Sequence, residues 1–236
     1  MERVAAVNID HMLSIIIPTL NEADGIADVL ESLATLRERG AEVIVADGGS
    51  DDATLEIAAS LADRIIDAPR GRALQMNAGA AAASGDTLLF LHADTRLPDD
   101  ADRLIASALA AGVAWGRFDV RIEGVHPMLA VIASMMNLRS RITGIATGDQ
   151  AIFMRRRTFD AAGGFPEQPL MEDIAMSSAL RRLSPPACLR ERARTSGRRW
   201  EKNGVLRTIV LMWSLRLRYF LGADPAALAL IYRRGR

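Results

Sequence analysis

The sequence predicts an α/β fold built on a mostly parallel central sheet flanked by helices, and three features carry that prediction. Short apolar runs rich in β-branched residues, as in strands buried on both faces, recur through the first hundred residues. Segments with helical spacing of apolar residues separate these runs, and such alternation is typical of parallel βαβ units. Polar residues follow the runs directly, where a parallel sheet gathers them at one edge.

The first half of the chain supplies four strands and three helices of this pattern. Residues 24–39 have apolar side chains at helical spacing, and Gly40 ends the helix. Ser50 or Asp51 is expected to cap the helix Ala53 to Leu61. The remaining helix is Leu74 to Ala83, and the strands are Leu13 to Pro18, Glu42 to Ala46, Arg64 to Asp67 and Thr87 to Leu91.

The second half is less regular, and its elements are predicted singly from their apolar runs. We find no internal repeat or linker, so one domain is expected over residues 1–200, with a helical tail over 201–236 packed on it. The expected strands are Val113 to Ile122, Ala151 to Met154 and Ala187 to Thr195, and the helices are Pro127 to Arg141, Met171 to Leu183, Val205 to Leu221 and Pro225 to Tyr232.

Composition excludes several classes of protein. The chain has 236 residues, of which 50% are hydrophobic and 25% charged, so it can bury enough apolar surface to fold. The single cysteine, Cys188, cannot form an internal disulfide. No apolar run approaches the roughly 20 residues that span a bilayer, and Met1 to His11 lacks the pattern of a signal peptide. These features predict a cytoplasmic protein.

Charge is balanced in total but unevenly distributed. The first 100 residues carry 7 basic and 18 acidic side chains, whereas residues 186–236 carry 12 and 3. The acidic first half argues against a nucleic-acid partner, which needs a basic face. The basic end fits an anionic surface such as a phosphate group or lipid headgroups. Attraction between the two halves of the chain explains the same asymmetry.

Polar side chains follow three of the predicted strands, where α/β sheets bind ligands. The first of these turns lacks the glycines of a dinucleotide fingerprint, and no Walker loop is present. Asp47 is suited to accept a hydrogen bond from a nucleobase and Glu22 to accept from ribose hydroxyls. A helix cap and a turn residue are the alternative interpretation of these two. The polar residues at the strand ends are Thr19, Asn21, Glu22, Asp47, His92 and Asp94.

Two further groups of residues suggest chemistry. Asp94, directly after a buried strand, is suited to hold Mg²⁺ or Mn²⁺ beside a diphosphate, and His92 favours Mn²⁺. Glu172 and Asp173 open a predicted helix, where a carboxylate can act as a general base toward an acceptor hydroxyl. Favourable charge at the helix start explains the same pair.

Six segments occur in a fixed order along the chain: PTLNE (Pro18 to Glu22), ADGGSDDAT (Ala46 to Thr54), Arg72 with Asn77 and Gly79, SGDTLLFLHADT (Ser84 to Thr95), TGDQAIFMRR (Thr147 to Arg156) and GGFPEQPLMEDIAMSSALRR (Gly163 to Arg182). Together they resemble family 2 glycosyltransferases of the GT-A fold, a nucleotide-diphospho-sugar transferase type. The resemblance covers residues 13–200 and is specific to fold and donor type, not to substrate. The chain is also similar to a bacterial subgroup found with radical-SAM and selenodomain proteins, part of it linked to arsenosugar biosynthesis.

The resemblance implies a role for individual positions. Asp47 would read the nucleobase, Asp94 with His92 would hold Mn²⁺ or Mg²⁺, and Asp173, beside Glu172, would be the catalytic base. The nucleotide side would further include Pro18, Thr19, Asn21, Glu22, Gly48, Arg72, His92 and Ala93, and the sugar and acceptor side Gly148, Asp149, Arg199 and Trp200.

The implied reaction is an inverting transfer of a sugar from a nucleotide-diphosphate sugar to the hydroxyl of a small-molecule or lipid-linked acceptor. The chain departs from the family pattern at two positions. His92 replaces the first aspartate of the D-x-D metal motif, which leaves the metal open. Ser196 replaces the glutamine of a Q-x-x-R-W motif, which argues against processive polymer synthesis. A nucleotidyltransferase and a non-catalytic sugar-nucleotide binder are the alternatives.

The apolar segment Val205 to Leu221 raises the question of a membrane. With Trp213, Tyr219 and its arginines it suits the interface of a membrane, which would place the protein at the inner face, near a lipid-linked acceptor. Packing against the sheet or against a second subunit explains the same residues.

Overall fold

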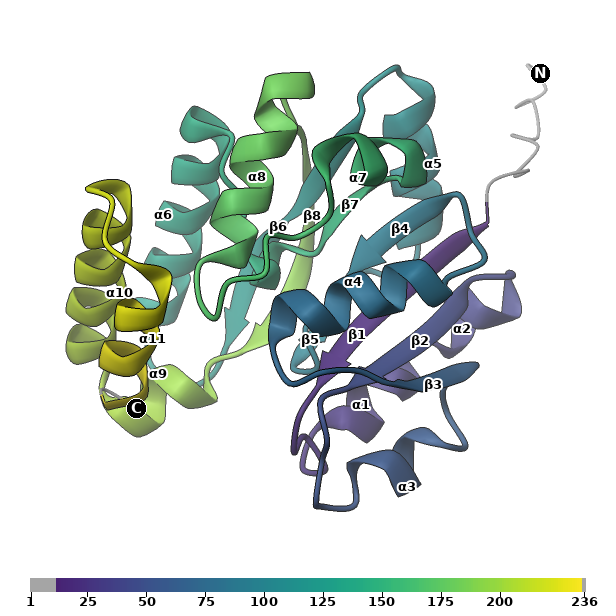
Figure 1. The fold of residues 1–236 in the computed structure, drawn as a ribbon, viewed down its shortest axis with the longest axis horizontal. Coiled ribbons are helices and arrows are strands. Elements are labelled where there is room, and N and C mark those ends of the chain that lie inside the picture. Colours follow the sequence, from purple (N-terminus) through teal and green to yellow (C-terminus); the bar gives the residue numbers. More distant parts are fainter. Residues whose placement is uncertain (1–11, 235–236) are drawn as a thin grey trace.

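A computed structural model describes residues 12–234 (Figure 1). The stretch Met1 to His11, which lacks a signal-peptide pattern, lies outside the described residues. Eight strands form one sheet in the order β3-β2-β1-β4-β7-β6-β8-β5. The strands are β1 Leu13–Thr19, β2 Glu42–Asp47, β3 Arg64–Asp67, β4 Thr87–Phe90, β5 Thr95–Arg96, β6 Trp115–Glu123, β7 Ile152–Arg155 and β8 Ala187–Ser196.

The sheet is parallel in its first half and mixed in its second. β3, β2, β1 and β4 pair in parallel, as predicted, and β6 also runs parallel to β8. β7 is antiparallel to both β4 and β6, and the short β5 is antiparallel to β8. The register sets Thr19 opposite Asp47, so two of the predicted strand-end residues are neighbours across β1 and β2.

Helices cover both faces of the sheet, and alternate residues of β1 serve the two layers. Ile15 and Ile17 pack in the core that α1, α2 and α5 cover, whereas Ile16 packs under α4, α7 and α8. The helices are α1 Ile26–Ser32, α2 Ala34–Glu38, α3 Thr54–Ala58, α4 Arg72–Ala82, α5 Ala101–Ala110, α6 Met128–Thr143, the 3₁₀ helix η1 Gly148–Gln150, α7 Arg156–Ala162, α8 Glu172–Leu183, α9 Arg198–Asn203, α10 Val205–Phe220 and α11 Pro225–Arg234.

Several predicted elements are corrected by the structure. The helix over residues 24–39 is interrupted at Leu33 and forms α1 and α2. Neither Ser50 nor Asp51 caps α3, because the N-cap is Ala53 and the Ser50 side chain bonds to Asp47 instead. β5, η1, α5, α7 and α9 were not predicted. Apart from α5 they are seven residues or fewer, too short for a periodic pattern to stand out.

The last two helices stand at the end of the molecule away from β3 (yellow in Figure 1). Leu215 of α10 and Leu228 of α11 form a small apolar core with Met171, the residue before α8. The C-terminal helices therefore contact the start of α8, which contains the predicted base Asp173. None of the helices in residues 12–234 combines the length and the apolar character that crossing a membrane requires.

Candidate functional site

A cavity of about 1080 Å³ lies beyond the ends of the central strands. It is larger than a typical small-molecule pocket, which suits a ligand with several parts. Most predicted site residues line it, namely Pro18, Glu22, Arg72, His92, Ala93, Asp94, Asp149, Glu172, Asp173, Arg199 and Trp200. Among the described residues, five other predicted ones do not line the cavity: Thr19, Asn21, Asp47, Gly48 and Gly148.

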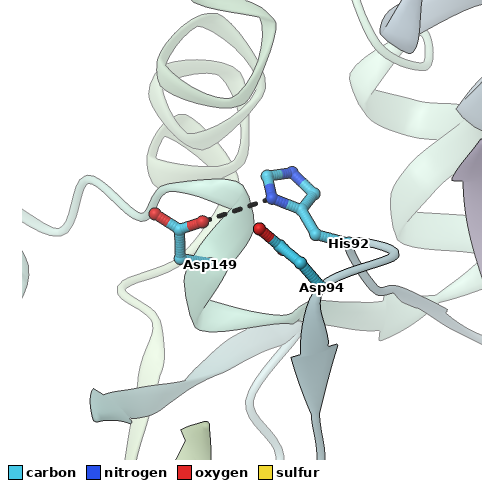
Figure 2. Close-up of side chains that lie close together, drawn as sticks. All are labelled: His92, Asp94 and Asp149. Atoms are coloured by element: carbon cyan, nitrogen blue, oxygen red, sulfur yellow. Dashed lines mark hydrogen bonds and ion pairs between the residues drawn. The ribbon is translucent and has the colours of Figure 1, made fainter. Parts of the chain in front are cut away.

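Three side chains with metal-ligating atoms converge at the sheet edge of the cavity (Figure 2). His92 and Asp94 come from the turn between β4 and β5, and Asp149 comes from η1, next to β7. One ligating atom from each lies within 4.8 Å of the others. The Nδ1 atom of His92 lies 3.3 Å from an Asp149 carboxylate oxygen. The sequence prediction placed Asp149 on the sugar side; the structure places it against His92.

The charges of this cluster depend on one another. Burial and Arg72 lower the pKa of His92, but the hydrogen bond and charge of Asp149 and the charge of Asp94 outweigh them and raise it above its ordinary value. Burial raises the pKa of Asp149, but His92, Arg199 and Arg72 lower it on balance. One imidazole and two carboxylates form a donor set that fits a divalent metal, and the nitrogen favours Mn²⁺ over Mg²⁺.

Gly148 connects this cluster with the predicted base. A Cβ atom at this position would lie 1.9 Å from Nε2 of His92, so only glycine lets η1 pack against the imidazole. The backbone N–H of Gly148 donates a hydrogen bond of 2.7 Å to a carboxylate oxygen of Asp173. Residue 148 therefore positions a candidate metal ligand and the candidate base together.

Glu172 and Asp173 have different environments although they are adjacent. Glu172 is buried and forms an ion pair with Arg72, with a nitrogen–oxygen distance of 2.9 Å. Burial and the charge of Asp173 raise the pKa of Glu172 despite the opposing effect of Arg72. Burial lowers the pKa of Arg72, but Glu172 and Asp173 outweigh it and raise that pKa. Glu172 thus fixes α4 to α8, whereas Asp173 faces the cavity.

Backbone strain occurs at three non-glycine residues in segments that carry predicted site residues. Within residues 12–234, the non-glycine residues with positive φ are Asn21, Ala151 and Met171, at 55°, 47° and 67°. Asn21 follows β1, Ala151 follows η1 and Met171 precedes Glu172. Such a conformation costs about 1 to 3 kcal/mol per residue and concentrates at functional sites. Asn21 is itself a predicted site residue, and Met171 lies directly before Glu172 and lines the cavity.

Asp47 is buried at the end of β2, and its carboxylate is saturated with hydrogen bonds. Its oxygens accept from the Ser50 and Gly49 backbone N–H groups and from the Ser50 and Thr19 hydroxyls. These bonds lower its pKa although burial works in the opposite direction. A carboxylate has about four acceptor positions, so the observed bonds occupy all of them. Asp47 therefore shapes the turn that follows β2.

Asn21 and Gln75 complete that corner of the molecule. Asn21 accepts a hydrogen bond from the Asp51 N–H, while its own N–H donates to Ser50, so the turns after β1 and β2 are joined. Gln75 of α4 donates to the carbonyls of Thr19 and Ala46. A Cβ on Gly48 would lie 3.0 Å from Gln75. Gln75 was not predicted, because a single glutamine in a helix does not form a recognisable sequence pattern.

Two other cavity residues were also missed. Arg139 of α6 and Arg216 of α10 line the wall that faces Asp173 and the metal-ligating cluster. Their signal in the sequence is a cation within a helix segment that is otherwise mostly apolar. The remaining predicted cation, Arg199, stacks over the Tyr232 ring at 4.9 Å from its centre, which ties α9 to α11.

Comparisons with known proteins agree with this geometry. The profile described as Glycosyl transferase family 2 matches residues 14–162. The PGL/p-HBAD biosynthesis glycosyltransferase of Mycobacterium bovis (strain BCG / Pasteur 1173P2) is 42% identical over 108 residues, which cover 43% of this chain and 42% of that protein. The succinoglycan biosynthesis protein ExoA of Rhizobium meliloti is 38% identical over 173 residues, covering 65% and 52%. The chain thus spans about half the length of these relatives.

Solved structures share the fold. A mannosyltransferase from Pyrobaculum calidifontis in complex with GDP-Man and Mn²⁺ superposes with a TM-score of 0.68 at 18% identity, covering 94% of this chain and 68% of that one. S. aureus TarS 1-349 in complex with UDP-GlcNAc gives 0.64 at 21% identity, covering 78% and 58%.

Proposed function

This chain belongs to glycosyl transferase family 2 and is a glycosyltransferase, and on that premise we propose that it performs a metal-assisted, inverting transfer of a sugar. The donor is a nucleotide-diphosphate sugar and the acceptor carries a hydroxyl group. One observation carries the proposal: Asp94 and Asp173, 79 positions apart in the sequence, line the same cavity.

His92, Asp94 and Asp149 are the residues that would hold the metal, since their ligating atoms converge and their donor set suits Mn²⁺ or Mg²⁺. When bound, a divalent cation supplies positive charge that offsets the negative charge developing on the departing diphosphate. Arg199 lines the same cavity and contributes further positive charge.

Asp173 is the general base of the proposed reaction. Its carboxylate takes the proton of the acceptor hydroxyl as that oxygen forms a bond to the anomeric carbon and the bond to the diphosphate oxygen breaks. The hydrogen bond from Gly148 holds the carboxylate in place, and the ion pair of Glu172 with Arg72 fixes the start of α8. Glu172 is buried and acts by positioning.

On the donor side, Glu22 and Pro18 line the cavity and are proposed to contact the nucleotide. Because Asp47 and Thr19 bond to each other and to the turn after β2, we infer that they act on the base through Gly48 and Ser50. The two structural neighbours described above were solved with UDP-GlcNAc and with GDP-Man, so uridine and guanosine donors are the first to test. The ordered motifs support the finer placement in the radical-SAM-associated subgroup, which the neighbouring genes would test.

A membrane surface is a proposed partner. Leu206, Val210, Trp213 and Leu217 of α10 recur at helical spacing and are 60 to 74% exposed. The basic residues Arg207 and Arg218 flank them. Such a face suits the interface of an anionic membrane, which would place the protein at the inner face. Flotation with anionic liposomes tests this, and a protein that stays unbound at low salt would exclude it.

Donor binding and turnover test the main proposal. A nucleotide sugar far above its dissociation constant should raise stability by roughly 2 to 4 kcal/mol in a thermal melt, and more so with Mn²⁺. Release of nucleoside diphosphate from that donor should need the metal and be lost in Asp94→Ala. Release of pyrophosphate would indicate a nucleotidyltransferase, and binding without turnover a non-catalytic sugar-nucleotide binder.

A further inference from the structure

Two arginines of the cavity wall have no polar partner among the residues that the structure describes. Arg139 lies on α6 and Arg216 on α10, and both line the cavity. Within residues 12–234, neither guanidinium has a hydrogen bond or an ion pair, and three of their nitrogens, Nε and Nη2 of Arg139 and Nε of Arg216, are shielded from solvent. A buried donor without a partner costs folding free energy. Both residues therefore oppose folding of the ligand-free protein.

The pKa values of the two arginines are also lowered by their surroundings. Burial, together with Arg216 and Arg117, lowers the pKa of Arg139 to about 10. Burial likewise lowers the pKa of Arg216. Asp173 acts on both in the opposite direction, through space, without forming an ion pair. The two guanidiniums thus form a site of unbalanced positive charge within reach of the proposed base.

This site is built on other elements than the candidate metal cluster, although the charge of Asp149, a member of that cluster, also acts on Arg216. The cluster lies at the sheet edge, on β4 and η1, whereas Arg139 and Arg216 project from helices α6 and α10. Asp173 acts electrostatically on both arginines, and Gly148 joins it to the cluster. The two arginines are therefore close enough to the proposed base for a group that they bind to lie beside it. Met135 and Trp213, one turn away on the same helices, also line the cavity and are more than half exposed.

We propose that Arg139 and Arg216 bind an anionic group, a phosphate monoester, on the acceptor, and so hold the acceptor hydroxyl against Asp173. The inference rests on the proposed function, because it assigns the acceptor side of that reaction. Guanidinium groups bind phosphate through charge-assisted hydrogen bonds, and the guanidinium nitrogens of the two arginines that are not shielded from solvent are open to such a ligand in the cavity. The phosphate belongs either to a small soluble molecule or to a lipid, and the exposed Met135 and Trp213 favour an apolar chain next to it.

The test measures phosphate binding in the full chain first loaded with Mn²⁺ and UDP or GDP. Glycerol 1-phosphate serves as the soluble probe and dodecyl phosphate as the lipid-like one, with glycerol and dodecyl maltoside as uncharged controls. The phosphate probes should bind and the uncharged controls should not. Arg139→Gln and Arg216→Gln should each weaken phosphate binding roughly tenfold, the effect of one lost charge-assisted hydrogen bond. Their affinity for UDP or GDP should stay within about twofold of the wild-type value.

Arg182→Gln is the matched control, because Arg182 is an exposed arginine on a helix, α8, and lies outside the cavity lining; it should leave phosphate binding unchanged. The melting temperature of ligand-free Arg139→Gln and Arg216→Gln should equal or exceed that of the wild type, whereas a structural role would lower it. Two results overturn the proposal: neither phosphate probe binds, or the two variants lose nucleotide affinity instead, which would assign the arginines to the donor diphosphate.

The result also separates this inference from the proposed function. If UDP and GDP fail to bind with Mn²⁺ but the phosphate probes bind through Arg139 and Arg216, the anion site stands and the transferase proposal falls. If dodecyl phosphate binds at least tenfold more tightly than glycerol 1-phosphate, the phosphate belongs to a lipid-linked acceptor. Equal affinities assign it to a small soluble acceptor.

Discussion

Two groups of opposite charge, buried Asp47 and half-buried Arg216, show how the two sides of this molecule differ. Asp47, at the end of β2, has a bonding partner at every acceptor position. Arg216, on α10, has neither a hydrogen bond nor an ion pair among the described residues. A satisfied buried group stabilises the fold, whereas an unsatisfied one opposes it unless a ligand completes it. On the sheet side, Asp47 therefore stabilises the fold. On the helical side, Arg216 is available to bind a ligand.

The largest effect is expected on turnover, for a substitution in the cavity that should leave stability unchanged. Asp173→Asn keeps an oxygen that can accept from Gly148 but removes the base, so turnover should fall about 10² to 10⁴-fold. Donor affinity and the melting temperature should not change. Release of nucleoside diphosphate measures turnover, and Glu167→Gln, at an exposed acid in the loop before α8, is the control. Full turnover in Asp173→Asn would refute the assignment of the base.

Two substitutions test whether Asp47 and Arg216 contribute differently to the stability of the fold. Asp47→Asn places an amide nitrogen among hydrogen-bond donors, so the free energy of unfolding at neutral pH should fall by about 1 to 3 kcal/mol. Arg216→Gln should not lower it. Urea denaturation measures both, and equal losses would remove the distinction between the two sides.

The loss in Asp47→Asn should also depend on pH. The pKa of Asp47 is lower in the folded protein, so its contribution to stability is present above the ordinary value of about 3.9 and declines as the pH falls toward the folded value. The difference between wild type and Asp47→Asn should therefore shrink in acid. A constant difference would mean that the charge of Asp47 contributes nothing.

The contact that joins the two sides should also contribute less in acid, but the change should come at a higher pH, because the folded pKa of Glu172 is raised and that of Asp47 is lowered. Arg72→Met removes the cation beside buried Glu172 and should lower stability by about 1 to 3 kcal/mol at neutral pH. The folded pKa of Glu172 is already raised, and the loss of Arg72 raises it further. A protonated Glu172 needs no cation, so the loss should diminish as the pH falls through the folded pKa toward the ordinary value of about 4.3.

Urea titrations at several pH values measure this dependence. Arg70→Met, at an exposed arginine two positions earlier, is the control and should have little effect. A loss in Arg72→Met that is independent of pH would show that packing of the Arg72 side chain, and not its charge, stabilises the start of α8.

The smallest effect is expected on the outer face of α10. Leu206 is 74% exposed, so Leu206→Ser should change the free energy of unfolding by no more than about 0.5 kcal/mol, while flotation with anionic liposomes should decrease. A larger loss of stability would mean that this face is covered in the folded protein, for example by a second subunit.

Predictions from the sequence were most accurate for elements that are defined by a local pattern of residues. The four strands of the first half were predicted to within one residue at each end, because buried strands are continuous apolar runs. The GT-A-like α/β class was also correct. The short α7 and α9 were missed because they have no periodicity of their own and depend on the elements that they follow. The break at Leu33 was missed because its apolar spacing fits one continuous helix.

The fold class, the family and eleven of the residues that line the cavity followed from the sequence alone, because each depends on a local pattern or an ordered motif. Only the tertiary structure decided which of these residues meet. Within residues 12–234 it brought Asp149 of η1 against His92, saturated Asp47 with hydrogen bonds, and left Arg139 and Arg216 without a hydrogen bond or an ion pair. These outcomes depend on distances between groups remote in sequence, and such distances follow from how the helices pack on the sheet.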